Sequence, residues 1–221
     1  MVEFSKENIQ TALNAAVQDV MSKDANLLKI KSSERGIVHW LANYFEEHIK
    51  NNSNTTKFNH DNGYVVDVEY SRTYDDIKRF EHMKESLCRE DCPYPATDDC
   101  SKYKNKQTYY TVTLDMIFHK RLTNPLDANI LCVEVKTSSA NRSSAAVLTK
   151  MLSCDKKRVK YLISDKDKSE PTYQFGATVY IESESDARIN FFEHGSQQYT
   201  SYTLLQNSKM QNISTHSLSG I

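Results

Sequence analysis

Three charged side chains in two otherwise apolar segments have the residue types and spacing to do chemistry. Asp115 lies within the sequence TLDMI, and Glu134 and Lys136 lie within the sequence CVEVK. Because successive side chains of a strand point to opposite faces, Glu134 and Lys136 share one face, and the aliphatic residues beside them occupy the other. If the two segments are neighbouring strands joined by a loop over residues 121–129, Asp115 and Glu134 converge at one end.

Two carboxylates and a lysine are suited to metal-assisted hydrolysis of a phosphodiester. Mg²⁺ prefers carboxylate oxygens, keeps several waters and binds through few protein ligands together with substrate phosphate. The metal lowers the pKa of a bound water and neutralises charge on the phosphate, and the ammonium group of Lys136 can steady the attacking water. In the structural alternative, Glu134 and Lys136 form only a cross-strand pair. Asp115 is harder to explain in this way, because aspartate is disfavoured in strands.

The series from Asp115 to Glu134-x-Lys136 resembles the D…(D/E)xK signature of the PD-(D/E)xK nuclease superfamily. Leu114 replaces the proline that precedes the aspartate in that signature. Glu34 matches a glutamate that the superfamily carries on the helix before its core strands, and its helical spacing places it on an inward stripe. In the structural alternative, Glu34 only favours the helix N-terminal dipole.

The resemblance covers roughly residues 33–195 and implies a restriction-endonuclease-like fold of the α/β class, with a central mixed β-sheet flanked by helices. It also implies DNA as the substrate, Mg²⁺ or Mn²⁺ as the cofactor and a homodimer as a frequent assembly. Lys136 would serve the attacking water. The implied metal ligands are Asp115, Glu134, the Val135 carbonyl and Glu34. The sequence Asp155-Lys156-Lys157-Arg158 is similar to a D-x-x-(K/R) helix of small bacterial members that could contact the DNA backbone.

Hydrophobic spacing predicts the elements that must position these residues. Apolar stripes predict helices over residues 5–21, 33–50 and 145–163. Runs of β-branched and aromatic residues predict strands over 64–72, 109–120, 130–136, 173–181 and 188–193. The strand–helix–strand order around the third helix favours parallel pairing inside a mixed sheet. We expect a single domain over residues 1–200 and a polar C-terminal tail over 201–221.

An insertion at about residues 78–107 contains three of the five cysteines. Cysteine and histidine are the usual ligands of structural zinc, so a zinc site is one interpretation, formed by His82, Cys88, Cys92 and Cys100. The alternatives are a loop with incidental thiols, a disulfide formed on oxidation, or an iron–sulfur cluster. The insertion could also contact a protein partner. Cys132 and Cys154 fall on core elements and are expected to be packing residues.

The charge balance limits how the chain could hold nucleic acid. Lys and Arg number 28 against 29 Asp and Glu, for a formal net charge of −1, which excludes a protein that binds nucleic acid by bulk positive charge. Local basic groups remain candidates for DNA contact, and the alternative is a solvated charged face. The candidates are Lys120, Arg121, Lys156 and Arg158.

The sequence lacks the features of several other classes. Its five glycines form no phosphate-cradling loop. No stretch approaches the roughly 18 to 20 apolar residues that span a bilayer, and the N-terminus does not resemble a signal peptide. We therefore expect a cytoplasmic protein with reduced thiols and no membrane partner.

The main hypothesis is a Mg²⁺-dependent endonuclease that hydrolyses DNA, in restriction, defence or repair. The alternative is a catalytically inactive nucleic-acid-binding or protein-interaction module of the same fold. The replaced proline and the acidic surroundings of the insertion keep this alternative open. Those acidic residues are Glu90, Asp91, Asp98 and Asp99.

Overall fold

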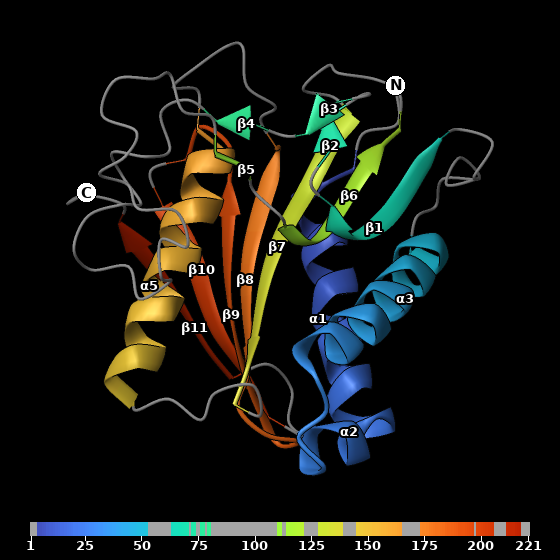
Figure 1. Ribbon diagram of the computed structural model, residues 1–221, viewed down its shortest axis with the longest axis vertical. Coiled ribbons are helices and arrows are strands. Elements are labelled where there is room, and N and C mark those ends of the chain that lie inside the picture. Colours follow the sequence, from blue (N-terminus) through green and yellow to red (C-terminus); the bar gives the residue numbers. More distant parts are fainter. Residues whose placement is uncertain are drawn as a thin grey trace.

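A seven-stranded mixed β-sheet forms the centre of the molecule, with helices on both faces (Figure 1). The computed structural model describes residues 4–52, 63–70, 72–73, 76–77, 79–80, 110–111, 114–121, 128–138, 145–164, 173–196, 198–205 and 211–217. The strand order is β1 (Tyr64–Tyr70), β6 (Leu114–Lys120), β7 (Asn129–Thr137), β8 (Phe175–Ile181), β9 (Asp186–Glu193), β10 (Gln198–Leu205) and β11 (Gln211–Ser217). Two small ribbons pair β2 (Arg72–Thr73) with β3 (Asp76–Ile77) and β4 (Arg79–Phe80) with β5 (Tyr110–Thr111).

Strand β7 lies inside the sheet between β6 and β8, and it is buried along its whole length. It runs antiparallel to β6 and parallel to β8. The parallel pair requires a crossover connection, because two parallel strands cannot be joined by a tight turn. Helix α5 (Ala145–Leu162) lies in this connection. The predicted strand–helix–strand unit is therefore confirmed, and so is the α/β class with a mixed sheet and flanking helices.

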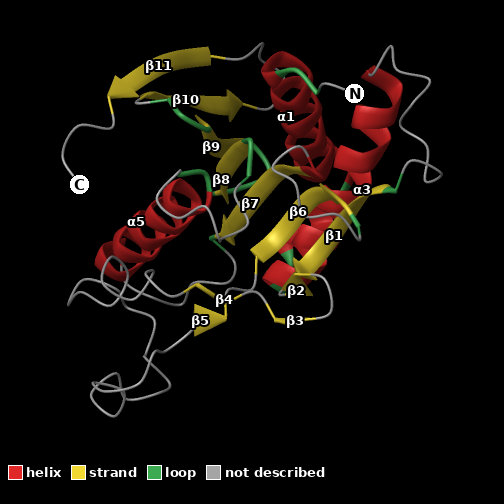
Figure 2. Cartoon of the chain, turned by 90° about the horizontal axis from the view of Figure 1, so that it is seen from above, coloured by secondary structure: helices red, strands yellow, loops and turns green. Residues whose placement is uncertain are grey.

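Two hydrophobic clusters sit on opposite faces of the sheet. Helices α1 (Lys6–Lys23), α2 (Ala25–Lys29) and α3 (Glu34–Asn52) contribute to the larger cluster, which includes Val133 and Val135 of β7. Helix α5 contributes Val159 and Leu162 to the second cluster, which includes Cys132. Figure 2 shows α5 on one side of the sheet and α1 with α3 on the other. The alternation of β7 therefore directs Glu134 and Lys136 to the face that α5 covers.

A glycine lets α5 approach the sheet closely. A Cβ atom at Gly176 of β8 would lie 2.4 Å from Cγ1 of Val159 and 3.1 Å from Cγ2 of Ile163. Real Cβ atoms do not approach another carbon so closely, because optimal carbon–carbon separation is about 3.5 to 4.0 Å. Gly176 therefore sets the distance between α5 and β8, and with it the position of the polar side chains that α5 carries.

A serine caps the start of α1 and the start of α3. The hydroxyl of Ser5 accepts a hydrogen bond from the Asn8 N–H (3.2 Å) and caps α1. The hydroxyl of Ser33 accepts one from the Gly36 N–H (3.3 Å). This contact places Glu34 in the first turn of α3.

Several boundaries differ from the sequence predictions. The long strand expected over 109–120 is divided between β5 and β6, which belong to different sheets. The short helix α2 was not predicted. Residues 201–221, expected to form a tail, contribute the end of β10 and the whole of β11, so the expected domain boundary at residue 200 falls inside β10. Tyr202 and Leu204 are buried in the larger cluster, which explains why β10 joins the sheet.

Most of the predicted insertion at about residues 78–107 lies outside the described residues, apart from the short strand β4. Among the described residues, no helix combines the length and the apolar character that a bilayer crossing requires.

Candidate functional site

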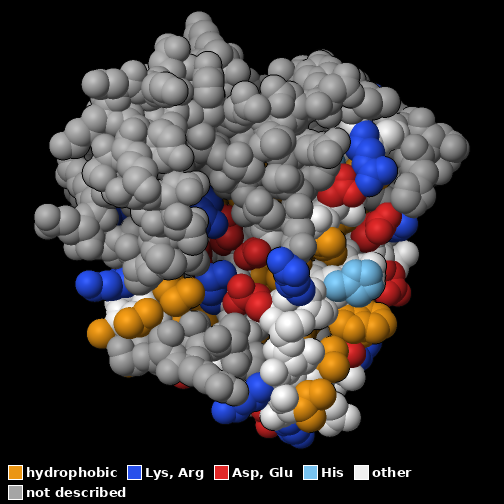
Figure 3. All heavy atoms as spheres, in the orientation of Figure 1, with side chains coloured by type: hydrophobic (Ala, Val, Ile, Leu, Met, Phe, Trp, Pro, Cys, Tyr) orange, Lys and Arg blue, Asp and Glu red, His pale blue; other side chains and the backbone are white. Residues whose placement is uncertain are grey.

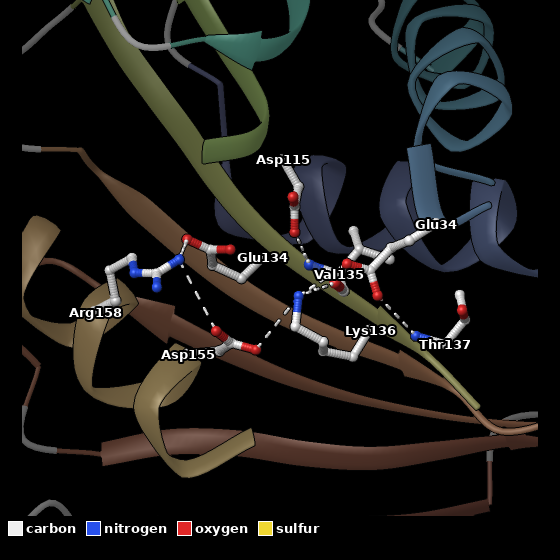
Figure 4. Close-up of polar contacts among 8 residues, drawn as sticks. All are labelled: Glu34, Asp115, Glu134, Val135, Lys136, Thr137, Asp155 and Arg158. Atoms are coloured by element: carbon white, nitrogen blue, oxygen red, sulfur yellow. Dashed lines mark hydrogen bonds and ion pairs between the residues drawn. The ribbon is translucent and has the colours of Figure 1, made fainter. Parts of the chain in front are cut away.

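Six charged side chains from four elements meet where β6 and β7 face α5 and the start of α3 (Figure 4). Each lies within hydrogen-bond or ion-pair distance of another member, or of the β7 backbone between them. We name this group the polar cluster, and its members are Glu34, Asp115, Glu134, Lys136, Asp155 and Arg158.

Asp115 and Glu134 come from adjacent antiparallel strands. In the β6–β7 register, Met116 lies opposite Val133 and Ile117 lies opposite Cys132, so one more step sets Asp115 opposite Glu134. Oδ2 of Asp115 accepts a hydrogen bond from the Val135 N–H at 2.7 Å. This bond fixes the Asp115 carboxylate against β7 and confirms the predicted proximity of the two strands.

Glu134 is almost completely buried and is paired with an arginine. The residue is 2% exposed, and its Oε1 lies 2.6 Å from Nη1 of Arg158. Burial raises the pKa of Glu134 well above its usual range; the Arg158 charge opposes this rise, while Asp115 and Asp155 add to it. The ionised form of Glu134 therefore depends on a cation beside it.

Lys136 is held at the other end of the polar cluster. Its Nζ donates to Oε1 of Glu34 at 2.9 Å and to the Val135 carbonyl at 3.0 Å. Oε2 of Glu34 accepts from the Thr137 N–H at 3.3 Å. Burial raises the pKa of Glu34, and the charge and hydrogen bond of Lys136 oppose that rise. Glu34 thus ties α3 to β7 and orients the Lys136 ammonium group.

Asp155 lies between the two cationic side chains of the polar cluster, Lys136 and Arg158. Its residue is 1% exposed, with Oδ2 at 3.9 Å from Nζ of Lys136 and Oδ1 at 3.9 Å from Nη1 of Arg158. Asp155 and Arg158 are three positions apart on α5, so both fall on one helix face. Sequence reasoning singled out this D-x-x-R spacing but expected an outward contact with DNA. It did not foresee that Asp155 enters the site.

All four predicted catalytic residues therefore belong to the polar cluster, and the cluster has the donor chemistry for a hard divalent cation. With every group ionised, four carboxylates face two cationic side chains, which leaves a formal excess of two negative charges. Carboxylate oxygens of Asp115 and Glu134 and the Val135 carbonyl are hard ligands, and Mg²⁺ often takes only one or two protein carboxylates. Their oxygen atoms are of the kind that Mg²⁺ or Mn²⁺ would take.

Glu34 is placed differently from the other predicted ligands. Both of its oxygens are hydrogen-bonded, one to Lys136 and one to Thr137. Within the described part of the chain, no three His, Cys, Asp or Glu side chains are grouped closely enough to share an ion. The geometry thus associates Glu34 with Lys136, and its role as a metal ligand stays a prediction.

The predicted DNA-contact residues differ in their surroundings. Nζ of Lys120 lies 5.8 Å from the ring centroid of Tyr64. The exposed Arg121 is ion-paired with Asp67, which is also bonded to His119. Burial alone would raise the pKa of Asp67, but the hydrogen bonds and charges of His119 and Arg121 outweigh it and lower that pKa to about 2. This network joins the edge strand β1 to β6.

On α5, two lysines lie against aromatic rings of the sheet. Nζ of Lys156 is 5.5 Å from the ring centroid of Tyr199, and Nζ of Lys160 is 5.4 Å from the same centroid. Burial lowers the pKa of both lysines. Arg158, by contrast, is directed into the polar cluster. In the orientation of Figure 3, acidic and basic side chains of the described residues are mixed over the middle of the molecule.

The five cysteines separate into two groups. His82, Cys88, Cys92 and Cys100 lie outside the described residues, so the zinc site stays a prediction. Cys132 and Cys154 are buried in the core, as expected for packing residues.

Comparison with known proteins found no match among family models, curated proteins or solved structures.

Proposed function

We propose that this chain is a divalent-metal-dependent deoxyribonuclease, an endonuclease of the PD-(D/E)xK type that uses Mg²⁺ or Mn²⁺. The observation that carries the proposal is the placement of the motif residues. Asp115 and Glu134 occupy adjacent antiparallel strands on the face that α5 covers, and Lys136 follows on the same strand with its ammonium group bonded to Glu34. Strand alternation puts Glu134 and Lys136 on one face, and the pairing of β6 with β7 brings Asp115 to the same face, which supports the proposal.

Each residue of the site has a distinct role in the proposed reaction. Asp115, Glu134 and the Val135 carbonyl would hold the cation, which when bound supplies Lewis acidity toward a water and a phosphate oxygen. Glu34 and the Val135 carbonyl fix the Lys136 ammonium group in the buried site, where a positive charge stabilises developing negative charge better than in water. Lys136 would therefore orient the attacking water and stabilise the charge that develops on the phosphate.

DNA is the proposed substrate. The proposed assembly is a homodimer, whose two sites would act on the two DNA strands, and the proposed location is the cytoplasm. We also propose, independently of the nuclease activity, that the insertion at about residues 78–107 binds structural zinc and contacts a protein partner.

A nicking assay on supercoiled plasmid tests the activity. Wild-type protein should nick or cut DNA with Mg²⁺ or Mn²⁺ and lose this activity with EDTA. Glu134→Gln and Lys136→Met should each abolish it, since one removes a metal-binding charge and the other the ammonium group. Lys150→Met is a matched control because Lys150 is an exposed residue on α5, and it should cut normally. Equal cleavage by wild type and both site variants would refute the assignment.

A catalytically inactive nucleic-acid-binding module is the second candidate. One specific observation favours it: Glu134 and Glu34 are already neutralised by the chain's own Arg158 and Lys136. Calorimetry with Mn²⁺ distinguishes the two functions. The nuclease should bind Mn²⁺ and lose binding in Glu134→Ala, whereas the inactive module should bind DNA and give no Mn²⁺ binding in either form.

A further inference from the structure

The Arg158 guanidinium is paired with Glu134, a carboxylate that is a proposed metal ligand. Its Nη1 lies 2.6 Å from Oε1 of Glu134 and 3.9 Å from Oδ1 of Asp155. Figure 4 shows the side chain reaching from α5 toward β7, with its guanidinium group beside both carboxylates. Arg158 therefore neutralises Glu134 from the α5 side.

Lys136 lies at the opposite end of the polar cluster from Arg158. It donates to Glu34 and to the Val135 carbonyl. Asp155 lies between the two cations, at 3.9 Å from each. Arg158 could thus leave Glu134 and keep Asp155 as an electrostatic partner, while Lys136 stays in place.

The burial of Glu134 explains why a cation is needed before any metal arrives. An ionised carboxylate that is 2% exposed is costly without a paired positive charge. A divalent cation on the same carboxylate would supply that charge, and two cations at one carboxylate repel each other. The Arg158 side chain is 20% exposed, so part of it already contacts solvent, and a free arginine side chain has many rotamers.

We propose that Arg158 is the resident counter-ion of Glu134, and that a divalent cation must displace it to enter the site. This inference rests on the proposed function, because it concerns the same metal site. Arg158 is then a positioning residue that keeps the metal-free protein folded with its carboxylates gathered, at the expense of metal affinity.

Titration calorimetry with Mn²⁺ in the absence of DNA tests the exchange. Arg158→Met removes the competing charge and keeps much of the side-chain length, so it should bind Mn²⁺ on the order of tenfold more tightly, equivalent to about 1.4 kcal/mol. Lys150→Met removes one positive charge from an exposed position of the same helix, and its affinity should stay within about twofold of wild type. Arg158→Met binding Mn²⁺ no more tightly than Lys150→Met would overturn the inference.

Loss of Arg158 could also prevent folding, so a second measurement uses wild-type protein. The Nε–H resonance of Arg158, assigned by its absence from the spectrum of Arg158→Lys, should shift when Mg²⁺ saturates the site. A resonance that does not move at saturating Mg²⁺ would overturn the inference even if Arg158→Met is unfolded.

These experiments distinguish a failure of the Arg158 proposal from a failure of the proposed nuclease function. If wild-type protein binds no Mn²⁺, the proposed nuclease function is wrong and the exchange is wrong with it. If wild type binds Mn²⁺ and cuts DNA while the two measurements above show no displacement, the function stands and only the role of Arg158 is wrong.

Discussion

Replacement of Gly176 by alanine should destabilise the protein by pushing α5 away from the sheet. The new Cβ would lie 2.4 Å from Cγ1 of Val159 and 3.1 Å from Cγ2 of Ile163. The first distance is at least about 1 Å short of optimal carbon–carbon separation. Both contacts are made by buried side chains of the second cluster, which have little room to move. Overpacking of this kind typically costs about 1 to 3 kcal/mol.

Thermal denaturation measures the effect. For a chain of this size, a loss of about 2 kcal/mol corresponds to a fall in Tm of roughly 4 to 8 °C. Gly36→Ala is a matched control, because its Cβ would meet only serine hydroxyls, at 3.3 and 3.5 Å. Alanine is the better helix former there, so the control should keep or raise the Tm. A Gly176→Ala protein as stable as wild type would refute the argument that this glycine sets the helix position.

Three further predictions concern other parts of the structure. Between pH 4 and pH 2, wild type should lose about 2 kcal/mol more unfolding free energy than Asp67→Asn. The pKa of the Asp67 carboxyl is lowered from 3.8 to about 2 in the fold, so this group stabilises the fold above its unfolded pKa and stops doing so as it protonates. Parallel pH profiles of the two proteins in urea denaturation would contradict this. Glu34→Gln should lower kcat for DNA cleavage by about 10- to 100-fold with little change in KM, because Lys136 loses its carboxylate partner; a change in KM alone would argue against an orienting role. Replacing Lys156 and Lys160 with glutamine should make the salt dependence of DNA affinity shallower by up to about two units in log–log slope, and an unchanged slope would exclude both lysines as phosphate contacts.

The main elements were predictable because their apolar spacing is strong. The apolar stripe of α3 has the period of a helix, and the apolar run of β7 is typical of a buried strand. Both predicted elements are confirmed. Strands β10 and β11 were not predicted, because their residues are largely polar, although the two strands are consecutive and pair with each other. The five-residue helix α2 is too short to show a period.

The site was partly predictable for the same reason. Strand alternation brings Glu134 and Lys136 to one face, and β6–β7 pairing brings Asp115 to them. The inward placement of Asp155 and Arg158 depends on how α5 docks, which the charged sequence around them does not reveal. A run of charges on a helix usually indicates a solvated face, and here the packing of α5 on β8 overrides that expectation.

The hydrogen bond between Lys136 and Glu34 has a consequence for folding. It joins residues 102 positions apart in the chain, whereas Arg158 and Glu134 are only 24 apart. Contacts of high sequence separation form late, because closing a long loop costs conformational entropy before the contact stabilises the chain. During synthesis α3 emerges well before β7, so Glu34 must wait for the strand that carries its partner. A nascent or partly unfolded chain would therefore lack an oriented lysine, and the chemistry would be confined to the completed fold.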